Sequence, residues 1–172
     1  GRIGRCTLRA IYEQGLQNEF EVVAINAAGD LATNAHLLKY DTTHGRFRTA
    51  VETEGENCII IDGKKIPFYS TKDPLGVNWA SHGVDVLLEC TGAYTTKAKA
   101  AALLEQGAQR VLISAPGGDD VDTTIVMGVN EGALNAGMTV VSNASCTTNC
   151  LAPVAKILSD SIGIKSGLMT TV

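Results

Sequence analysis

Residues 21–38 read EVVAINAAGDLATNAHLL and contain the pattern that decides the fold. Residues 22–25 form a short, continuous apolar run, which is typical of a strand buried on both faces of a parallel sheet. A glycine-containing turn at 26–29 closes that run. Asp30 can then cap a helix that extends to Leu38, because its carboxylate can accept hydrogen bonds from the free amides of the first turn. The stretch therefore predicts a strand, a turn and a helix in succession.

The same alternation is expected on both sides of this stretch. Before it, apolar positions at helical spacing follow Gly4 and stop near Gly15. After it, short glycine-containing links separate further elements. These are a hairpin of strands 58–61 and 65–69 turned at Asp62-Gly63, strands 84–90, 111–113, 124–127 and 139–141, helices 95–106 and 146–158, and a last strand-like run at 169–172. The order predicts an α/β fold with a doubly wound, mainly parallel sheet, whose ligands lie at the carboxyl ends of the strands.

Composition narrows the class of protein. Apolar residues make up 45% of the chain and charged residues 19%, which indicates a folded globular protein. The net charge is −4 and the basic residues are scattered, so neither nucleic acid nor an anionic membrane is an expected partner. No apolar run approaches the roughly 20 residues that span a bilayer. Five irregularly spaced cysteines fit free thiols in the cytoplasm better than a disulfide framework.

The opening Gly1-x-x-Gly4 matches the last part of a G-x-G-x-x-G phosphate loop. Glycines there would let the backbone approach a pyrophosphate, which the amides at the start of the following helix would attract. On its own the tetrapeptide is also compatible with a plain glycine turn. The buried strand that follows favours dinucleotide binding, and this strand ends where such folds place a ribose-binding acid. The chain has Asn26, Ala27 and Ala28 there, and so it has no carboxylate.

The stretch SNASCTTNC at 142–150 lies between a predicted strand and a predicted apolar helix. Ser145 is a candidate N-cap, which would make Cys146 the first helical residue. The unpaired amides and the positive end of the helix dipole would favour a thiolate there, so Cys146 is the candidate nucleophile. Cys150, one turn onward, is expected to face inward as a structural thiol. No metal site is expected, because no further ligand stands at suitable spacing. The three histidines, His36, His44 and His82, lie outside any catalytic pattern.

Four segments together closely resemble the phosphorylating glyceraldehyde-3-phosphate dehydrogenase family: GRIGR at the start, HLLKYDTTHGRF at 36–47, SNASCTTNCLAP at 142–153 and GLMTTV at the end. The resemblance covers the whole chain. It implies a Rossmann-like dinucleotide-binding domain over 1–143 whose first strand is missing, and the start of an α+β catalytic domain over 144–172. Both ends then look truncated, and a catalytic histidine is expected immediately after Val172. Residues 1–172 alone are expected to be inactive.

The resemblance also assigns roles to individual residues. Cys146 would attack the aldehyde carbonyl, hydride would pass to the nicotinamide, and inorganic phosphate would cleave the resulting thioester. Ser145 and Thr147, on either side of it, would help to bind phosphate. The positions expected to contact the dinucleotide are Gly1, Arg2, Ile3 and Gly4 along the pyrophosphate, Asn26, Ala27 and Lys72 on the adenosine side, and Thr91, Gly92 and Ser114 beside the nicotinamide half.

Ala27 stands where NAD-dependent members of that family carry Asp. The absence of this Asp removes both an anchor for the ribose of NAD and a repulsion against the 2′-phosphate of NADP. We therefore expect NADP to be used at least as well as NAD. Lys72 and the amides of the helix that starts near Leu31 are the expected attractive groups.

The sequence thus predicts an NAD(P)-dependent enzyme that oxidises glyceraldehyde 3-phosphate to 1,3-bisphosphoglycerate. The resemblance implies a cytoplasmic homotetramer in glycolysis or gluconeogenesis. Erythrose-4-phosphate dehydrogenase is the closest alternative, although those relatives carry His-Pro-Gly where this chain has Ala115-Pro116-Gly117. A non-catalytic dinucleotide-binding module is a second alternative, of a different class.

Overall fold

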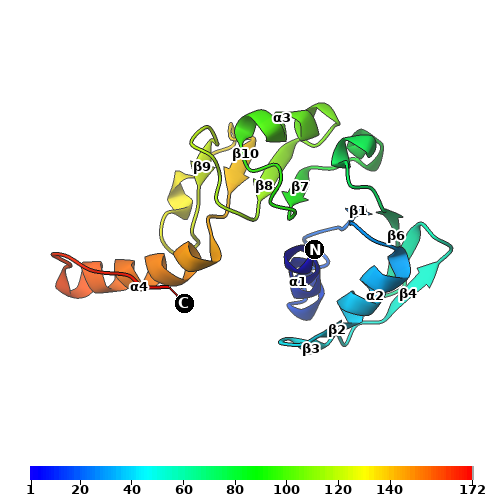
Figure 1. The fold of residues 1–172 in the computed structure, drawn as a ribbon, viewed down its shortest axis with the longest axis horizontal. Coiled ribbons are helices and arrows are strands. Elements are labelled where there is room, and N and C mark those ends of the chain that lie inside the picture. Colours follow the sequence, from blue (N-terminus) through cyan, green and yellow to red (C-terminus); the bar gives the residue numbers. More distant parts are fainter. Residues whose placement is uncertain (172) are drawn as a thin grey trace. The chain divides into compact units, whose positions relative to one another are not determined.

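The structure, a computed structural model, describes residues 1–171 and divides into two compact units (Figure 1). Unit 1 contains residues 1–84 and 105–108, and unit 2 contains residues 85–104 and the chain from 109 onward. Helices and strands alternate less regularly than the sequence predicts, because five strands between residues 40 and 69 follow one another without an intervening helix. The chain passes from unit 1 to unit 2 after residue 84. The expected boundary between the dinucleotide-binding and catalytic domains, at 143/144, stays a prediction.

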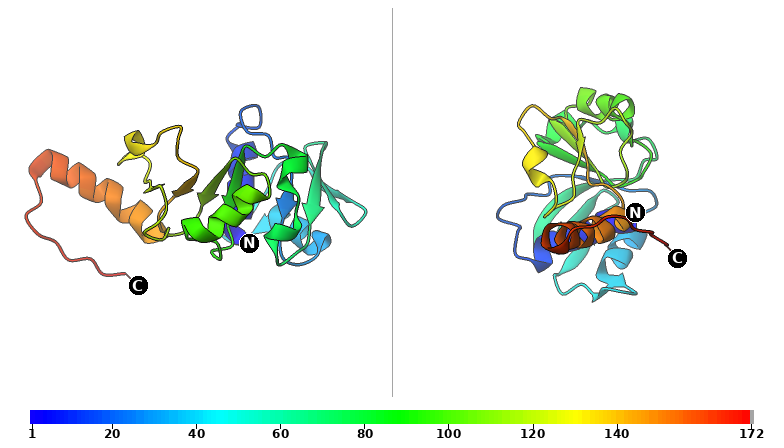
Figure 2. Two further views of the ribbon diagram at one scale, coloured as in Figure 1. Left: turned by 90° about the horizontal axis from the view of Figure 1, so that it is seen from above. Right: turned by 90° about the vertical axis from the view of Figure 1, so that its left-hand side faces the viewer.

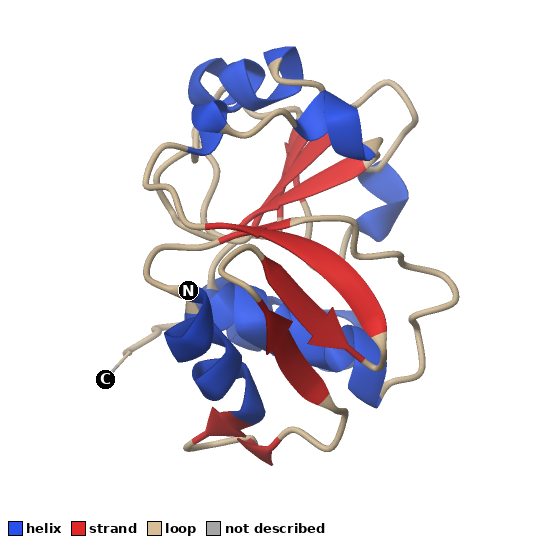
Figure 3. Ribbon diagram, turned by 90° about the vertical axis from the view of Figure 1, so that its right-hand side faces the viewer, coloured by secondary structure: helices blue, strands red, loops and turns tan. Residues whose placement is uncertain are grey.

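Unit 1 is built on a four-stranded sheet in the order β1-β6-β5-β4, drawn as red arrows in Figure 3. Its strands are β1 (Ile25–Asn26), β4 (Val51–Glu54), β5 (Cys58–Ile61) and β6 (Lys64–Tyr69). β1 runs parallel to β6, and the other neighbours are antiparallel. Asp62 and Gly63 join β5 to β6 with φ of 53° and 77°. Two positive φ values define the tight hairpin turn that an Asp-Gly pair favours.

Two helices cover the apolar face of this sheet. They are α1 (Arg2–Glu13) and α2 (Leu31–Lys39), and Asp30 caps α2 as predicted by accepting from the Thr33 amide at 2.7 Å. The hairpin β2 (Tyr40–Asp41) and β3 (Gly45–Arg46) and the short 3₁₀ helices η1 (Pro74–Gly76) and η2 (Trp79–His82) complete the unit. The core residues are Leu31, Ala35 and Leu38 of α2, Phe47, Val51, and Ile59, Ile61, Ile66 and Phe68 of the sheet.

Unit 2 has a wholly parallel sheet in the order β7-β8-β10-β9. The strands are β7 (Val86–Glu89), β8 (Arg110–Ile113), β9 (Thr123–Thr124) and β10 (Val140–Ser142). Helix α3 (Lys97–Glu105) packs on it through Ala100 and Leu103, which are fully buried. The short η3 (Glu131–Ala133) precedes β10, and α4 (Cys146–Ile162) follows it. Figure 2 shows α4 as one helix followed by a segment without regular structure.

Four sequence expectations need correction. The strand expected at 22–25 is confined to Ile25–Asn26, because only these residues pair with β6. The strand expected at 124–127 ends at Thr124, where the pairing with β10 stops. Residues 169–171 form no strand, and Val172 lies outside the described residues. Cys150 is exposed rather than inward-facing, since α4 buries none of its residues within the described chain.

Over residues 1–171, no helix is both long enough and apolar enough to cross a membrane.

Candidate active site

Cys146 lies at the start of α4, where the sequence places the nucleophile. The Ser145 hydroxyl accepts a hydrogen bond from the Thr148 amide at 3.0 Å, which confirms Ser145 as the N-cap and Cys146 as the first helical residue. The Cys146 side chain is exposed, and its Sγ lies 4.0 Å from the Thr147 hydroxyl. An exposed thiol at a helix N-terminus is accessible to a substrate and lies beside the free amides of the first turn.

A buried serine fixes the turn that precedes this helix. Ser142 is fully buried, and its hydroxyl donates to the Ala115 carbonyl at 2.7 Å. The same oxygen accepts from the amides of Gly117 and Ala144, each at 3.0 Å. Ala144 has φ of +57°, an uncommon conformation for a residue with a Cβ. From the helix side, the Asn149 side-chain Nδ2 donates to the Asn143 and Ser145 carbonyls, so the turn is held at both ends.

A buried carboxylate fixes the turn after β7. Glu89 is only 4% exposed and accepts hydrogen bonds from the Thr91 amide at 2.8 Å, the Gly92 amide at 3.1 Å and the Thr91 hydroxyl. Gly92 has φ of +75°, a conformation that glycine adopts without strain. The adjacent Cys90 is half-buried, and burial raises the pKa of its thiol. The Cys90 thiol is therefore a poorer nucleophile at neutral pH than an exposed thiol.

These turns lie at one edge of the unit 2 sheet. Glu89, Ile113 and Ser142 are partners in one row of the parallel register, at the carboxyl ends of β7, β8 and β10. The edge thus brings together Thr91-Gly92, Ser114 and the turn leading to Cys146, and it is where open α/β sheets bind ligands. The sequence analysis did not single out Glu89 or Ser142. A signal for both was present, because each is a polar residue at the end of an otherwise apolar strand.

In unit 1, the adenosine-side residues meet where β1 and β6 end. The Ala27 amide donates to the Tyr69 carbonyl at 3.0 Å, and the Asn26 side chain exchanges two 3.2 Å hydrogen bonds with the Thr71 backbone. Lys72 follows directly and is exposed. Asn26, Ala27 and Lys72 thus lie near the same strand ends of unit 1, and their part in cofactor binding stays a prediction.

The amides at the start of α2 were expected to attract the 2′-phosphate of NADP, but one of them is already bonded to Asp30. Asp30 accepts from both the amide and the hydroxyl of Thr33, at 2.7 and 2.8 Å. These bonds hold the pKa of the Asp30 carboxyl below its ordinary value, so the group stays ionised. The Thr33 amide is thus already bonded, and an anion at this helix start would meet a carboxylate. Lys72 remains the positively charged side chain among the expected adenosine-side residues.

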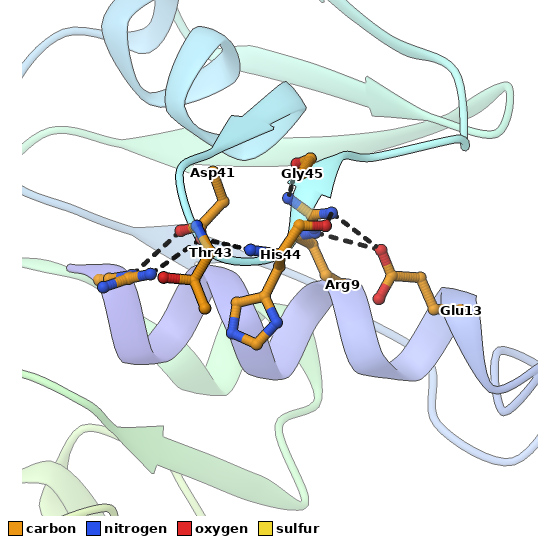
Figure 4. A network of polar contacts seen from close by, with 7 residues as sticks. Arg9, Glu13, Asp41, Thr43, His44 and Gly45 are labelled. Atoms are coloured by element: carbon orange, nitrogen blue, oxygen red, sulfur yellow. Dashed lines mark hydrogen bonds and ion pairs between the residues drawn. The ribbon is translucent and has the colours of Figure 1, made fainter.

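The glycine loop residues Gly1 to Gly4 begin α1, and no side chain caps that helix start. The Arg2 side chain is bonded elsewhere and is not free to bind a pyrophosphate. Its guanidinium forms two hydrogen bonds with Asp41, at 2.8 and 3.0 Å (Figure 4). Asp41 also accepts from the amides of Thr43 and His44, each at 2.9 Å, and these contacts hold its pKa well below the ordinary range. A bound phosphate would therefore meet the backbone at Arg2 and Ile3.

A second arginine fastens the same helix. Arg9 is buried, with 2% of its surface exposed, and donates to the carbonyls of His44 and Gly45 and to the Glu13 carboxylate (Figure 4). Its guanidinium carbon lies 5.2 Å from the centre of the Phe47 ring, which adds a cation–π contact. Arg2 and Arg9 together attach α1 to the β2–β3 loop.

Two of the three histidines contact tyrosine side chains. His82 Nε2 lies 2.7 Å from the Tyr69 hydroxyl, and the His36 ring lies 5.0 Å from that of Tyr40. His36, His44 and His82 all belong to unit 1, whereas Cys146 belongs to unit 2. In the part of the chain that the structure describes, no group of three or more His, Cys, Asp or Glu residues could hold a metal ion.

Comparison with known proteins agrees with this arrangement. Residues 1–97 match the family model described as glyceraldehyde 3-phosphate dehydrogenase, NAD binding domain, and residues 145–172 match the one described as glyceraldehyde 3-phosphate dehydrogenase, C-terminal domain. The chain belongs to the glyceraldehyde 3-phosphate dehydrogenase family. The first match contains every expected dinucleotide contact except Ser114, and the second contains Ser145, Cys146 and Thr147. The α/β, Rossmann-like fold class is thereby confirmed.

Individual relatives have the same name as the family. The chain is 55% identical over 172 residues to the plasmid glyceraldehyde-3-phosphate dehydrogenase of Cupriavidus necator. It is 52% identical to the enzyme of Pseudomonas aeruginosa over 172 residues and 51% identical to that of Streptomyces coelicolor over 173. Each comparison covers 100% of this chain but 51%, 51% and 50% of the respective relative. The chain thus spans about half the length of the curated relatives it matches.

Proposed function

We propose that the protein is a phosphorylating glyceraldehyde-3-phosphate dehydrogenase, which converts glyceraldehyde 3-phosphate and inorganic phosphate to 1,3-bisphosphoglycerate with NAD(P). The observation that carries the proposal is the exposed Cys146 at the N-terminus of α4, behind the Ser145 cap. The relatives named above are all called glyceraldehyde-3-phosphate dehydrogenase, which favours this aldehyde over erythrose 4-phosphate. A reactive thiol also argues against a purely binding module.

The chemistry follows from the position of the thiol. The Cys146 thiolate adds to the aldehyde carbon, and the resulting hemithioacetal stays attached to the helix start. A dinucleotide, when bound, would supply the hydride acceptor, and loss of a hydride and, to a base, of the hydroxyl proton would leave a thioester on Cys146. A phosphate oxygen then attacks the thioester carbon, and the bond to Cys146 breaks to regenerate the thiolate. Thr147, whose hydroxyl lies 4.0 Å from the sulfur, and Ser145, which precedes Cys146 in the chain, would orient that phosphate.

The residues present fit a dinucleotide. In unit 1, the uncapped start of α1 offers amides to a pyrophosphate. In unit 2, the turn at Thr91-Gly92, whose amides are bonded to Glu89, lies at the carboxyl edge of a parallel sheet, where such folds bind ligands. For the cofactor itself, the family match supports NAD. We propose in addition that NADP is used at least as well, because Ala27 has no carboxylate to repel a 2′-phosphate and Lys72 lies at the same strand ends.

For the whole protein we propose a cytoplasmic homotetramer with no nucleic-acid or membrane partner. Its partners would be the phosphorylated aldehyde, inorganic phosphate and NAD(P). The five cysteines are all free, which fits a reducing compartment. The net charge of −4 supports the absence of a nucleic-acid partner.

The test uses the full-length protein. NAD(P)H formation should require glyceraldehyde 3-phosphate and phosphate together, should be slower with erythrose 4-phosphate, and should cease when one equivalent of iodoacetamide has modified Cys146. Aldehyde present during alkylation should protect the thiol. Activity that survives complete modification of Cys146, or the absence of any aldehyde oxidation, would refute the proposal.

A further inference from the structure

The Ser142 hydroxyl stands at a junction between two parts of the proposed site. It is fully buried and uses its full capacity, with one donated and two accepted hydrogen bonds. Its partners belong to two different segments. Ala115 directly follows Ser114 in the segment after β8, and Gly117 lies two residues further along. Ala144 belongs to the turn that leads to Cys146.

The junction leaves little freedom for either segment. A Cβ at Gly117 would lie 2.8 Å from the Ser142 Cβ and 2.8 Å from a Val121 methyl, so the loop after β8 approaches Ser142 as closely as a glycine allows. The Asn143 amide also donates to the Ile113 carbonyl at 2.8 Å. On the other side, the Ser142 bond to the Ala144 amide is made where φ is +57°. An uncommon backbone conformation persists only when its surroundings hold it.

From this geometry, we propose that Ser142 is a positioning residue that sets Cys146 relative to the strand end carrying Ser114. The inference rests on the proposed function, since it concerns the same nucleophile. Ser142 touches neither sulfur nor substrate in this scheme. It acts through Ala144, which determines where Ser145 caps the helix, and through Ala115, which determines where Ser114 ends its strand.

Replacing the hydroxyl should therefore alter rate more than binding. In Ser142→Ala the buried amides of Gly117 and Ala144 and the Ala115 carbonyl lose their shared partner, and the nucleophile turn is released from the β8 loop. Since a misplacement of reacting groups on the order of 1 Å can cost up to about a hundredfold in rate, we expect kcat to fall by at least about tenfold. The KM for the aldehyde should change by no more than about twofold, because the contacts that bind the substrate equally in its ground state and transition state remain.

The matched control contacts the opposite end of the same strand. Asp122, which directly precedes β9, accepts from the amides of Thr139 and Val140 at 2.8 and 2.9 Å, at the start of β10, and pairs with Lys97. Asp122→Asn should lower the melting temperature of unit 2 without changing kcat. The two variants therefore separate loss of stability from loss of position.

The experiment compares full-length wild type, Ser142→Ala and Asp122→Asn in three measurements: kcat and KM, the melting temperature, and the rate of Cys146 alkylation by iodoacetamide at neutral pH, read by peptide mass spectrometry. A lower kcat and slower alkylation in Ser142→Ala alone support the proposal. Unchanged values in Ser142→Ala, or equal losses in both variants, overturn it. If the wild type lacks dehydrogenase activity, the proposed function fails, and the alkylation rates still decide the role of Ser142.

A second variant covers the case in which Ser142→Ala does not fold. Ser142→Cys keeps a weaker donor and acceptor in the same place. A folded Ser142→Cys protein with reduced kcat and slower Cys146 alkylation supports the positioning role, and wild-type values in it overturn that role. If neither variant folds, Ser142 is a structural residue and the proposal is wrong.

Discussion

Two cysteines one helical turn apart differ in one respect that matters for catalysis. Cys146 is the first residue of α4, next to the unpaired amides, whereas Cys150 lies one turn inside the helix, where the amides are already bonded. Both side chains are exposed, so accessibility does not distinguish them. The two cysteines differ instead in their distance from the positive end of the helix dipole.

Cys146→Ser in the full-length enzyme should therefore remove nearly all activity, because a serine hydroxyl is not ionised at neutral pH. Cys150→Ser should retain most of it. The measurement is kcat/KM for the aldehyde, with circular dichroism to verify folding. Equal losses in the two variants would show that the helix start does not select the nucleophile.

Ala27 is the single residue on which the prediction about cofactor choice depends. An Asp there would hydrogen-bond the ribose hydroxyls of NAD, and bonds to a charged group contribute roughly 1.5–3 kcal/mol each. The same Asp would repel the 2′-phosphate of NADP. Because the Ala27 amide is fixed by Tyr69 and Asn26 holds the Thr71 backbone, the new side chain would project from a defined position.

We expect Ala27→Asp to raise the ratio of kcat/KM for NAD to that for NADP by at least tenfold. Lys72→Ala is the companion variant and should weaken NADP more than NAD. A wild-type enzyme that prefers NAD by tenfold or more, or a ratio that Ala27→Asp leaves unchanged, would contradict this interpretation of the strand end.

Among elements, the attachment of α1 to the β2–β3 loop depends on ionisation. Asp41 has a folded-state pKa below its ordinary value of 3.8, chiefly because Arg2 and the His44 amide bond to its charged form. A group with a depressed pKa contributes stability above its unfolded value, and this contribution is lost as the pH falls through the folded value. The contact is therefore complete at neutral pH and weakens below about pH 4.

Asp41→Asn should consequently lower the urea midpoint at pH 7, and its difference from wild type should shrink as the pH falls below 3.8. Glu54→Gln is the control, since its pair with Lys65 joins side chains that are 55% and 64% exposed. Exposed pairs contribute between about zero and 1 kcal/mol. An Asp41→Asn difference that does not vary with pH would exclude the ionised contact as its cause.

Local signals in the sequence account for much of this architecture. Asp30 and Ser145 are caps that need only residues three positions onward, and Asp62-Gly63 determines its own hairpin turn. Interactions across longer distances were not predictable in the same way. Ser142 bonds to residues 25 and 27 positions away, and the strand at 22–25 is limited by where β6 runs beside it. Such pairings depend on the assembled sheet rather than on neighbouring residues.

On the scale of the whole molecule, α4 lacks the buried apolar face that would account for its stability. It has 17 residues, and none of them is buried. Val154, Ile157 and Ile162 are 53%, 64% and 80% exposed, although they are apolar. Most helical stability in proteins comes from packing of an apolar face, and this chain spans about half the length of its relatives. The exposed apolar side chains of α4 therefore predict that this helix packs against a further surface in the active enzyme.

A polypeptide of residues 1–172 should accordingly lack dehydrogenase turnover, because the helix that carries Cys146 leaves its apolar side chains exposed over the described residues. Purified alone, it should bind a hydrophobic dye strongly and produce no substrate-dependent NAD(P)H, whereas the full-length protein does. Ile157→Ala tests the packing argument independently. It should destabilise the full-length protein by about 2–5 kcal/mol, the usual cost of truncating a buried isoleucine, and leave the shorter polypeptide unaffected. Substrate-dependent NAD(P)H formation by residues 1–172, or a full-length protein indifferent to Ile157→Ala, would mean that α4 functions without that cover.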